Sequence, residues 1–340
     1  MFFKLFSSLA FWAISLIIFA QDVEFPAQAE TGPGGADYVH DSVIFQNYAD
    51  EPDGYWLFEP AKPKPAEAPV VVFMHGYSAY NPMVFGGWIS HLVRKGNIVV
   101  FPRYQKNLFT PSPDQFVSNT ATAIKNALKE LKSGDHVRPS DAPVCMVGHS
   151  FGGAIIANMS TEWEALGIPK PAGIMLVSPG TGPFRSFELP SYEKIPFDTK
   201  MLVVVSENDR VVGEDFGTLI FNTATKTPER NLLRQLEEQH KNLSITAGHN
   251  EVYAVDKKFD NGIHGHSYRK AQFSVINPVD YNGYWKLFDS LMECTRCGNL
   301  CQVAFGGTHE QLSLGNYSDG KPLRLWEVTL PEASTASKAK

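Results

Sequence analysis

One turn near the middle of the chain constrains its fold more than any other feature. A short apolar run, Val144–Val147, is followed by GHSFG and then by Gly153–Met159, a helix-compatible segment of mostly small residues. This order predicts a strand, a sharp turn and a helix, with Ser150 at the apex. Gly148 and Gly152 are structural in such a turn, because they let strand and helix approach without Cβ clashes. The Ser150 hydroxyl is then expected to project beyond the edge of a sheet.

Apolar runs elsewhere in the chain alternate with segments of helical periodicity. Continuous runs typical of strands buried on both faces are Val70–Met74, Asn97–Pro102, Gly173–Ser178 and Met201–Ser206. Helices are predicted over Pro82–Lys95, Asp114–Leu131, Pro228–Gln239 and Val279–Glu293. The alternation predicts an α/β fold, with a doubly wound, mostly parallel sheet and helices on both faces. The chain holds 27 glycines, so a G-x-S-x-G pattern could occur by chance. The position of this pattern between a predicted strand and a predicted helix is what makes it informative.

Weaker signals predict the remaining elements. Tyr38–Tyr48 and Tyr55–Glu59 lie on either side of an Asp-Gly turn and predict two antiparallel strands. Leu243–Thr246 and Leu323–Val328 predict short strands in the second half of the chain. Pro179–Lys200 is too short for a large lid domain, so none is expected, but it can form part of a substrate wall.

The two ends of the chain differ from its centre. Residues 1–20 combine an early lysine with an apolar segment and resemble a secretory signal peptide. Residues 21–37, rich in Pro and Gly, are expected to form a flexible leader, and residues 331–340 a polar tail. Residues 38–330 are predicted to form a single domain. We therefore expect export to an extracellular, periplasmic or secretory-pathway location with no stable membrane span, or membrane anchoring if the signal is not cleaved.

The four cysteines are unevenly distributed. Cys145 lies within a predicted buried strand and is read as a core residue. Cys294, Cys297 and Cys301 form a cluster after the last strong helix, which in an exported protein favours one disulfide with one thiol left over. A zinc site is the alternative, and it would need His309 as a fourth ligand.

A serine hydroxyl becomes a nucleophile only with a base to take its proton and a third group to orient that base. The acid is expected in the loop after the Met201–Ser206 strand, where Asp209 is the first choice and Glu207 the alternative. Three histidines follow as candidate bases, namely His249, His264 and His266. An alternative reading has these three histidines bind a metal, but no ligand spacing supports it, and we predict no metal site.

Attack on an ester carbonyl also requires donors for the resulting oxyanion. The backbone N–H groups of Phe151, after the nucleophile, and Tyr77, after the Val70–Met74 strand, are the candidates for this oxyanion hole. Their aromatic rings are expected to line an acyl pocket.

With these motifs the chain resembles α/β-hydrolases of the polyester hydrolase (cutinase-like) and dienelactone hydrolase type. The resemblance is carried by VVFMHGYSA, IVVFPRY, VGHSFGGA and VVSENDRVV, in that order, and covers about residues 40–293. Platelet-activating-factor acetylhydrolases and chlorophyllases are similar at the same places. The resemblance implies a triad of Ser150, Asp209 and a histidine, and it favours His266, because Gly265-His266-Ser267-Tyr268 precedes a Trp-bearing last helix. An apparent insertion at Gly248–Gly262 keeps His249 and His264 open as alternatives.

These observations predict an exported serine hydrolase that cleaves carboxylic esters through an acyl-enzyme and needs no cofactor. Small-molecule, lipid and polymeric esters all fit, and the sequence predicts no oligomeric state. A formal net charge of −6 provides no basic face for phosphates, so nucleic acid is not expected as a partner. An acyltransferase on the same fold, or a secreted binding module with a relic site, are the alternatives.

Overall fold

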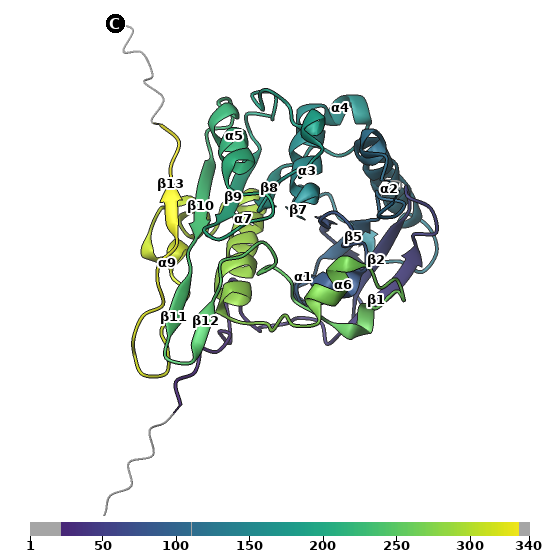
Figure 1. The fold of residues 1–340 in the computed structure, drawn as a ribbon. Coiled ribbons are helices and arrows are strands. Elements are labelled where there is room, and N and C mark those ends of the chain that lie inside the picture. Colours follow the sequence, from purple (N-terminus) through teal and green to yellow (C-terminus); the bar gives the residue numbers. More distant parts are fainter. Residues whose placement is uncertain (1–21, 110, 333–340) are drawn as a thin grey trace, which may run out of the picture.

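The computed structural model describes residues 22–109 and 111–332 (Figure 1). Within them the main sheet has nine strands in the spatial order β1-β2-β5-β4-β7-β8-β9-β10-β13. The strands are β1 Ser42–Tyr48, β2 Tyr55–Ala61, β4 Val70–Met74, β5 Ile98–Pro102, β7 Cys145–His149, β8 Gly173–Val177, β9 Lys200–Ser206, β10 Arg230–Gln235 and β13 Glu327–Thr329. The pairs from β5 to β10 are parallel, whereas β1, β2 and β13 pair antiparallel at the two edges. The predicted mostly parallel sheet is confirmed.

Helices cover both faces of this sheet. The longer helices are α1 Gly86–Arg94, α2 Phe116–Glu130, α3 Phe151–Thr161, α5 Asp215–Thr223 and α7 Lys286–Cys297. Alternate residues of the strands point to opposite faces, so Val71 and Phe73 pack with α1 and α7, while Val72 and Met74 pack with α2, α3 and α5. The two apolar layers explain why the central strands read as continuous hydrophobic runs.

Short elements connect the main ones. The two-stranded pairs are β3 Glu67–Ala68 with β6 Arg138–Pro139, and β11 Glu238–His240 with β12 Leu243–Ile245. The short helices are α4 Trp163–Leu166, α6 His266–Ala271, α8 Cys301–Phe305 and α9 His309–Leu312. The 3-10 turns are η1 Pro82–Phe85, η2 Pro113–Gln115, η3 Arg185–Phe187 and η4 Lys257–Phe259, and η5 Val279–Trp285 is a π-helix that leads into α7.

The helix predicted over Pro228–Gln239 is wrong. Residues 230–235 form β10, which pairs parallel with β9 and antiparallel with β13. Leu232 and Leu233 are buried on opposite faces of the sheet, which is a strand pattern. In a 12-residue window with few apolar residues, the helical and extended patterns are hard to separate, and pairing with β9 decides between them.

The segment expected to be a flexible leader lies against the domain in its described part. Val23 is buried, the Glu24 N–H donates to Ser318 Oγ at 3.0 Å, and the Gly34 N–H donates to Asp289 Oδ2 at 2.8 Å. The Tyr281 hydroxyl also donates to the Pro26 carbonyl. The predicted signal peptide lies outside the described residues, as does most of the predicted polar tail.

One disulfide joins Cys294, in α7, to Cys301, in α8, and leaves Cys297 as an exposed free thiol. Cys145 is a buried free thiol. The prediction of one disulfide with one thiol left over in the cluster is confirmed. Throughout the described ranges, no helix has the length and apolar character needed to cross a membrane.

Candidate active site

Ser150 sits in a strained turn between β7 and α3. Its φ of 54° and ψ of −122° are rare for a residue with a side chain. The conformation is held by hydrogen bonds, because the Ser150 N–H donates to the Val177 carbonyl at 2.9 Å and the Ser150 carbonyl accepts from Gly153 and Gly180. The serine side chain is thereby presented at the carboxyl end of the central strand β7.

The glycines of this turn permit a close approach of backbone segments. A Cβ on Gly152 would lie 2.5 Å from the His75 carbonyl oxygen and 2.6 Å from that of Met74. A Cβ on Gly148 would lie 2.7 Å from the Gly152 carbonyl carbon. Both contacts are closer than real Cβ atoms allow, so the turn requires glycine at both positions.

Asp209 follows β9 and is almost fully buried. Its Oδ1 accepts hydrogen bonds from the N–H groups of Val211 and Val212, at 2.9 and 3.0 Å. Burial raises the pKa of this carboxyl, but the hydrogen bond and charge interaction with His249 and the two backbone donors outweigh it, so the net pKa is lowered. Asp209 is therefore a carboxylate at neutral pH.

His249 connects Asp209 to Ser150. Its Nδ1 lies 2.7 Å from Asp209 Oδ2, and its Nε2 lies 3.0 Å from Ser150 Oγ. Because an ionised carboxylate can only accept, Nδ1 carries the proton and Nε2 is free to accept from the serine hydroxyl. The histidine follows β12, and its loop is tied to the Asp209 loop by a hydrogen bond from the Asn208 N–H to the Ala247 carbonyl.

The other two candidate histidines lie elsewhere. His264 is exposed, with Nε2 2.9 Å from Asp260 Oδ2 and its ring stacked on Tyr268. His266 is exposed at the start of α6 and, within the described ranges, makes no hydrogen bond to Ser150 or Asp209. It lines the same cavity as Ser150. The structure thus brings His249 to the serine, which differs from the preference for His266 that the resemblance implied.

Sequence reasoning missed His149, the residue before the serine. Its ring is buried and lies 4.6 Å from the His249 ring, and its Nε2 lies 2.9 Å from the His249 carbonyl oxygen. Burial, reinforced by the nearby His249, lowers the pKa of His149 well below its usual value, so the ring is neutral. A carbonyl can only accept, so Nε2 carries the proton, and Nδ1 is left buried without a hydrogen-bond partner in the described structure.

The loop after β4 lies against the serine turn, since a Cβ on Gly76 would be 3.1 Å from Ser150 Cβ. The loop is shaped by hydrogen bonds from the Ser78 N–H to Gln105 Oε1 and from the Ala79 N–H to the Gly76 carbonyl. The N–H groups of Tyr77 and Phe151 donate to no acceptor among the described residues. The candidate oxyanion donors are therefore both available to a bound molecule.

A cavity of about 380 Å³ opens over Ser150 and His249. Its apolar lining comes from Tyr77, Leu108, Val211 and Tyr253, and its charged lining from Arg269 and Lys270, with no carboxylate among the residues that line it. Tyr77 also belongs to a cluster of rings with Phe151, Phe184 and Phe187, whose neighbouring centroids are 4.9 to 6.2 Å apart. Phe184 and Phe187 come from the segment expected to form a substrate wall.

The comparisons with known proteins agree with this architecture. Comparison with curated proteins gives no match. A family model described as alpha/beta hydrolase fold matches residues 71–250, which are 180 of the 340 residues and include Ser150, Asp209 and His249. The match covers more than half of the chain, and the chain therefore belongs to the α/β-hydrolase fold family.

Proposed function

We propose that this chain is a serine hydrolase that cleaves carboxylic esters through an acyl-enzyme, with Ser150 as nucleophile, His249 as base and Asp209 as orienting acid. One observation carries the proposal: His249 lies within hydrogen-bond distance of both Ser150 Oγ and Asp209 Oδ2. This contact joins the loops after the parallel strands β7 and β9, at the edge of the sheet where α/β folds bind their ligands, to the loop after the antiparallel pair of β11 and β12.

Acylation follows from the proton positions. Asp209 accepts from His249 Nδ1 and so keeps the lone pair of Nε2 directed at the serine hydroxyl. As Ser150 Oγ attacks the ester carbonyl, Nε2 takes its proton and the imidazolium is stabilised by the ionised Asp209. The N–H groups of Tyr77 and Phe151 stabilise the oxyanion, a role worth about a hundredfold or more per donor in known hydrolases. The imidazolium then protonates the leaving alcohol.

Deacylation repeats these steps with water. His249 removes a proton from the water that attacks the acyl-serine carbonyl, and the same two N–H groups stabilise the second oxyanion. The proton then returns to Ser150 Oγ, so the free enzyme is regenerated without a cofactor.

The cavity lining suggests a narrower substrate class. A volume of about 380 Å³ is at the small end for ligand sites, which favours a short acyl chain. Arg269 and Lys270 place two positive charges in a lining that has no carboxylate, so esters with an anionic group on the acyl or alcohol part should bind better than cationic ones.

Export is part of the same proposal. The disulfide between Cys294 and Cys301 is compatible with an oxidising compartment, where such bonds persist. Among the described residues, this disulfide supports export and therefore agrees with the signal peptide predicted from the first 20 residues.

The test is active-site labelling with a fluorophosphonate probe. We expect the parent protein to be labelled, labelling to be lost in Ser150→Ala, and labelling to be slowed at least a hundredfold in His249→Ala. His264→Ala and His266→Ala are the matched controls and should keep near-normal rates, because neither histidine contacts Ser150 or Asp209 in the described structure. Ser150-independent labelling of folded protein would refute the proposal, and loss of rate only in His266→Ala would move the base to His266.

A further inference from the structure

The Tyr77 N–H, one of the two candidate oxyanion donors, has to be held in place without a hydrogen bond of its own. It donates to no acceptor among the described residues and so stays available to a bound molecule. A donor that is left unpaired for an oxyanion can be fixed only through the peptide groups beside it. The groups that bind the neighbouring residues, Gly76 and Ser78, therefore determine where the Tyr77 N–H points.

Ser78 has a backbone conformation that needs support. Its φ is 64°, in the left-handed region that residues with a Cβ rarely adopt. The residue is buried, and a buried N–H without an acceptor is costly. The Ser78 N–H finds its acceptor in a side chain, because it donates to Gln105 Oε1 at 2.8 Å.

Gln105 follows β5, and its side chain is held at both ends. The residue is 0% exposed, its Oε1 accepts from Ser78, and its Nε2 donates to the Asn107 carbonyl at 2.9 Å. The orientation of the amide is fixed, since a backbone N–H can only donate and a carbonyl can only accept. Gln105 thus forms a rigid connection between the loop after β5 and the loop after β4.

Other contacts between the same two loops lie away from the Ser78 amide. The Tyr104 hydroxyl donates to the His75 carbonyl at 2.8 Å, and the rings of these two residues stack with centroids 4.1 Å apart. The Tyr77 hydroxyl donates to the Leu108 carbonyl at 3.2 Å. These contacts fix the start of the loop and the Tyr77 ring, whereas Gln105 binds the backbone directly after Tyr77.

We propose that Gln105 is a positioning residue, which holds the Tyr77 N–H in the direction of the oxyanion by accepting the hydrogen bond from Ser78. The proposal rests on the proposed function, because the oxyanion forms only if Ser150 attacks a carbonyl. The loop is close enough for this role, since a Cβ on Gly76 would lie 3.1 Å from Ser150 Cβ. Gln105 itself is buried and is not among the residues that line the cavity over Ser150, so it acts through the loop and not by touching substrate.

The first test is Gln105→Met, which keeps the length of the side chain and removes its amide. We expect kcat on a short-chain nitrophenyl ester to fall about 10- to 100-fold, somewhat less than the loss of a whole oxyanion donor. KM should stay within about threefold, because the oxyanion is stabilised in the transition state and not in the bound ester. Gln105→Glu keeps an oxygen that can accept from Ser78 in either protonation state, and it should recover part of the lost kcat.

A trifluoromethyl ketone inhibitor reports on the oxyanion donors directly. Ser150 Oγ adds to the ketone carbon, the electron pair of the C=O π bond moves onto oxygen, and His249 takes up the serine proton. The product carries an oxyanion where the ester reaction would form one. Its dissociation constant should rise about 10- to 100-fold in Gln105→Met, in parallel with the fall in kcat.

Gln311, in α9, provides a matched control. It is 1% exposed, its Oε1 accepts from the Gly307 N–H at 2.8 Å, and its Nε2 donates to the Ala304 carbonyl, so it repeats the bonding pattern of Gln105 outside the cavity over Ser150. Gln311→Met should lower stability to urea but keep kcat per active site within about twofold of the parent. Active sites are counted by titration with the fluorophosphonate probe, which excludes unfolded protein from the comparison.

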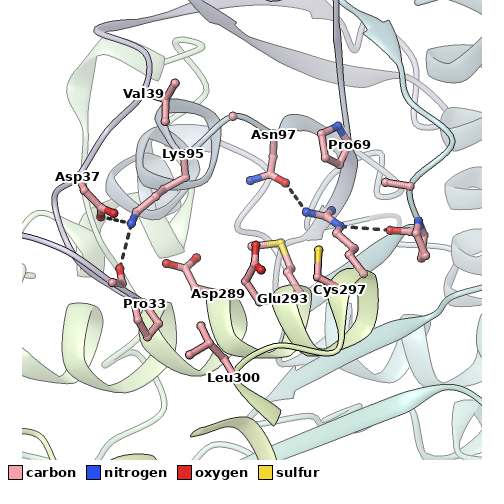
Figure 2. Close-up of a pocket in the computed structure, with 16 residues that line it drawn as sticks. Pro33, Asp37, Val39, Pro69, Lys95, Asn97, Asp289, Glu293, Cys297 and Leu300 are labelled. Atoms are coloured by element: carbon pink, nitrogen blue, oxygen red, sulfur yellow. Dashed lines mark hydrogen bonds and ion pairs between the residues drawn. The ribbon is translucent and has the colours of Figure 1, made fainter.

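Asn97 gives a second control on the same strand, because it precedes β5 whereas Gln105 follows it. It lies in a cavity of about 590 Å³ away from Ser150, where it accepts from Arg296 at 2.8 Å and donates to the Leu92 carbonyl at 2.9 Å (Figure 2). Asn97→Leu removes both hydrogen bonds at the far end of β5. It should likewise lower stability and leave kcat per active site within about twofold.

Several outcomes would overturn the role of Gln105. They are a kcat in Gln105→Met within twofold of the parent, an equal loss of kcat in Gln311→Met, a loss confined to KM, or an unchanged affinity for the trifluoromethyl ketone. If Gln105→Met does not fold, Gln105→Asn gives the same test, because its amide is one carbon shorter and cannot reach Ser78 without movement. A parent protein without Ser150-dependent turnover would overturn the proposed function and this proposal together, whereas an active parent with a normal Gln105→Met would overturn this proposal alone.

Discussion

His149 offers a test of how His249, the proposed base, is positioned, because its replacement should lower activity without lowering stability. The His149 Nε2–H donates to the His249 carbonyl, while its buried Nδ1 has no partner in the described structure. His149→Leu replaces the ring with an apolar side chain of similar size. It removes one hydrogen bond, which contributes about 1 kcal/mol to stability, and also removes a buried unpaired nitrogen, which costs about 1–3 kcal/mol.

The two terms predict that His149→Leu is as stable as the parent or more stable, by up to about 2 kcal/mol. The His249 carbonyl nevertheless loses its donor, and the loop that holds His249 is then free to shift relative to Ser150. If about 1.4–3 kcal/mol of the positioning is lost, kcat on a short-chain nitrophenyl ester falls roughly 10- to 150-fold. KM should change little, because the His149 ring is buried and contributes little surface to the cavity over Ser150.

Stability is measured by urea denaturation and activity by steady-state kinetics. His149→Gln is the matched control, since its side-chain amide can donate to the same carbonyl and should restore part of kcat. The reasoning fails if His149→Leu keeps kcat within twofold of the parent, or if the loss of activity simply follows a loss of folded protein.

Three further predictions concern the Ser150 turn, Asp209 and the cavity over Ser150. Gly152→Ala places a Cβ 2.5 Å from the His75 carbonyl oxygen, so it should destabilise the fold by about 2 kcal/mol or more, measured by urea denaturation, and unchanged stability would contradict the close packing. The pKa of Asp209 is lower in the folded than in the unfolded chain, so its contribution to stability is present above the unfolded value and is lost as pH falls through the folded value. Asp209→Asn should therefore flatten the dependence of unfolding free energy on pH below about pH 4, and a parallel curve for the two proteins would refute this. The double variant Arg269→Ala/Lys270→Ala should raise KM for a nitrophenyl ester with a terminal carboxylate about threefold to tenfold relative to its neutral analogue, whereas an equal change for both esters would argue against charge recognition.

Much of the fold follows from local patterns. The buried strands read as continuous apolar runs because helices cover both of their faces, and the strand, turn and helix around Ser150 follow from the order of apolar residues and glycines. Membership of the α/β-hydrolase fold family is confirmed by the match over residues 71–250. The narrower resemblance to polyester and dienelactone hydrolases stays a prediction.

The helix predicted over Pro228–Gln239 shows where local patterns fail. Its leucines fit either a helix or a strand, and the free edge of β9 selects the strand because it offers hydrogen bonds to β10. In the same way, nothing within residues 22–37 indicates that they pack on the domain. Their partners, Asp289, Tyr281 and Ser318, lie more than 250 residues away in the chain.

The sequence by itself determined that Ser150 stands at the apex of a sharp turn and that Asp209 follows a buried apolar strand, because both properties depend on neighbours within about ten residues. Only the tertiary structure decided which histidine meets them. The choice of His249 over His266 depends on the distance between loops that are 99 residues apart in the chain, and that distance is set by the packing of β12 and its loop beside the Asp209 loop. The pairing of Cys294 with Cys301, which leaves Cys297 free, was decided in the same way, because α8 turns back against α7.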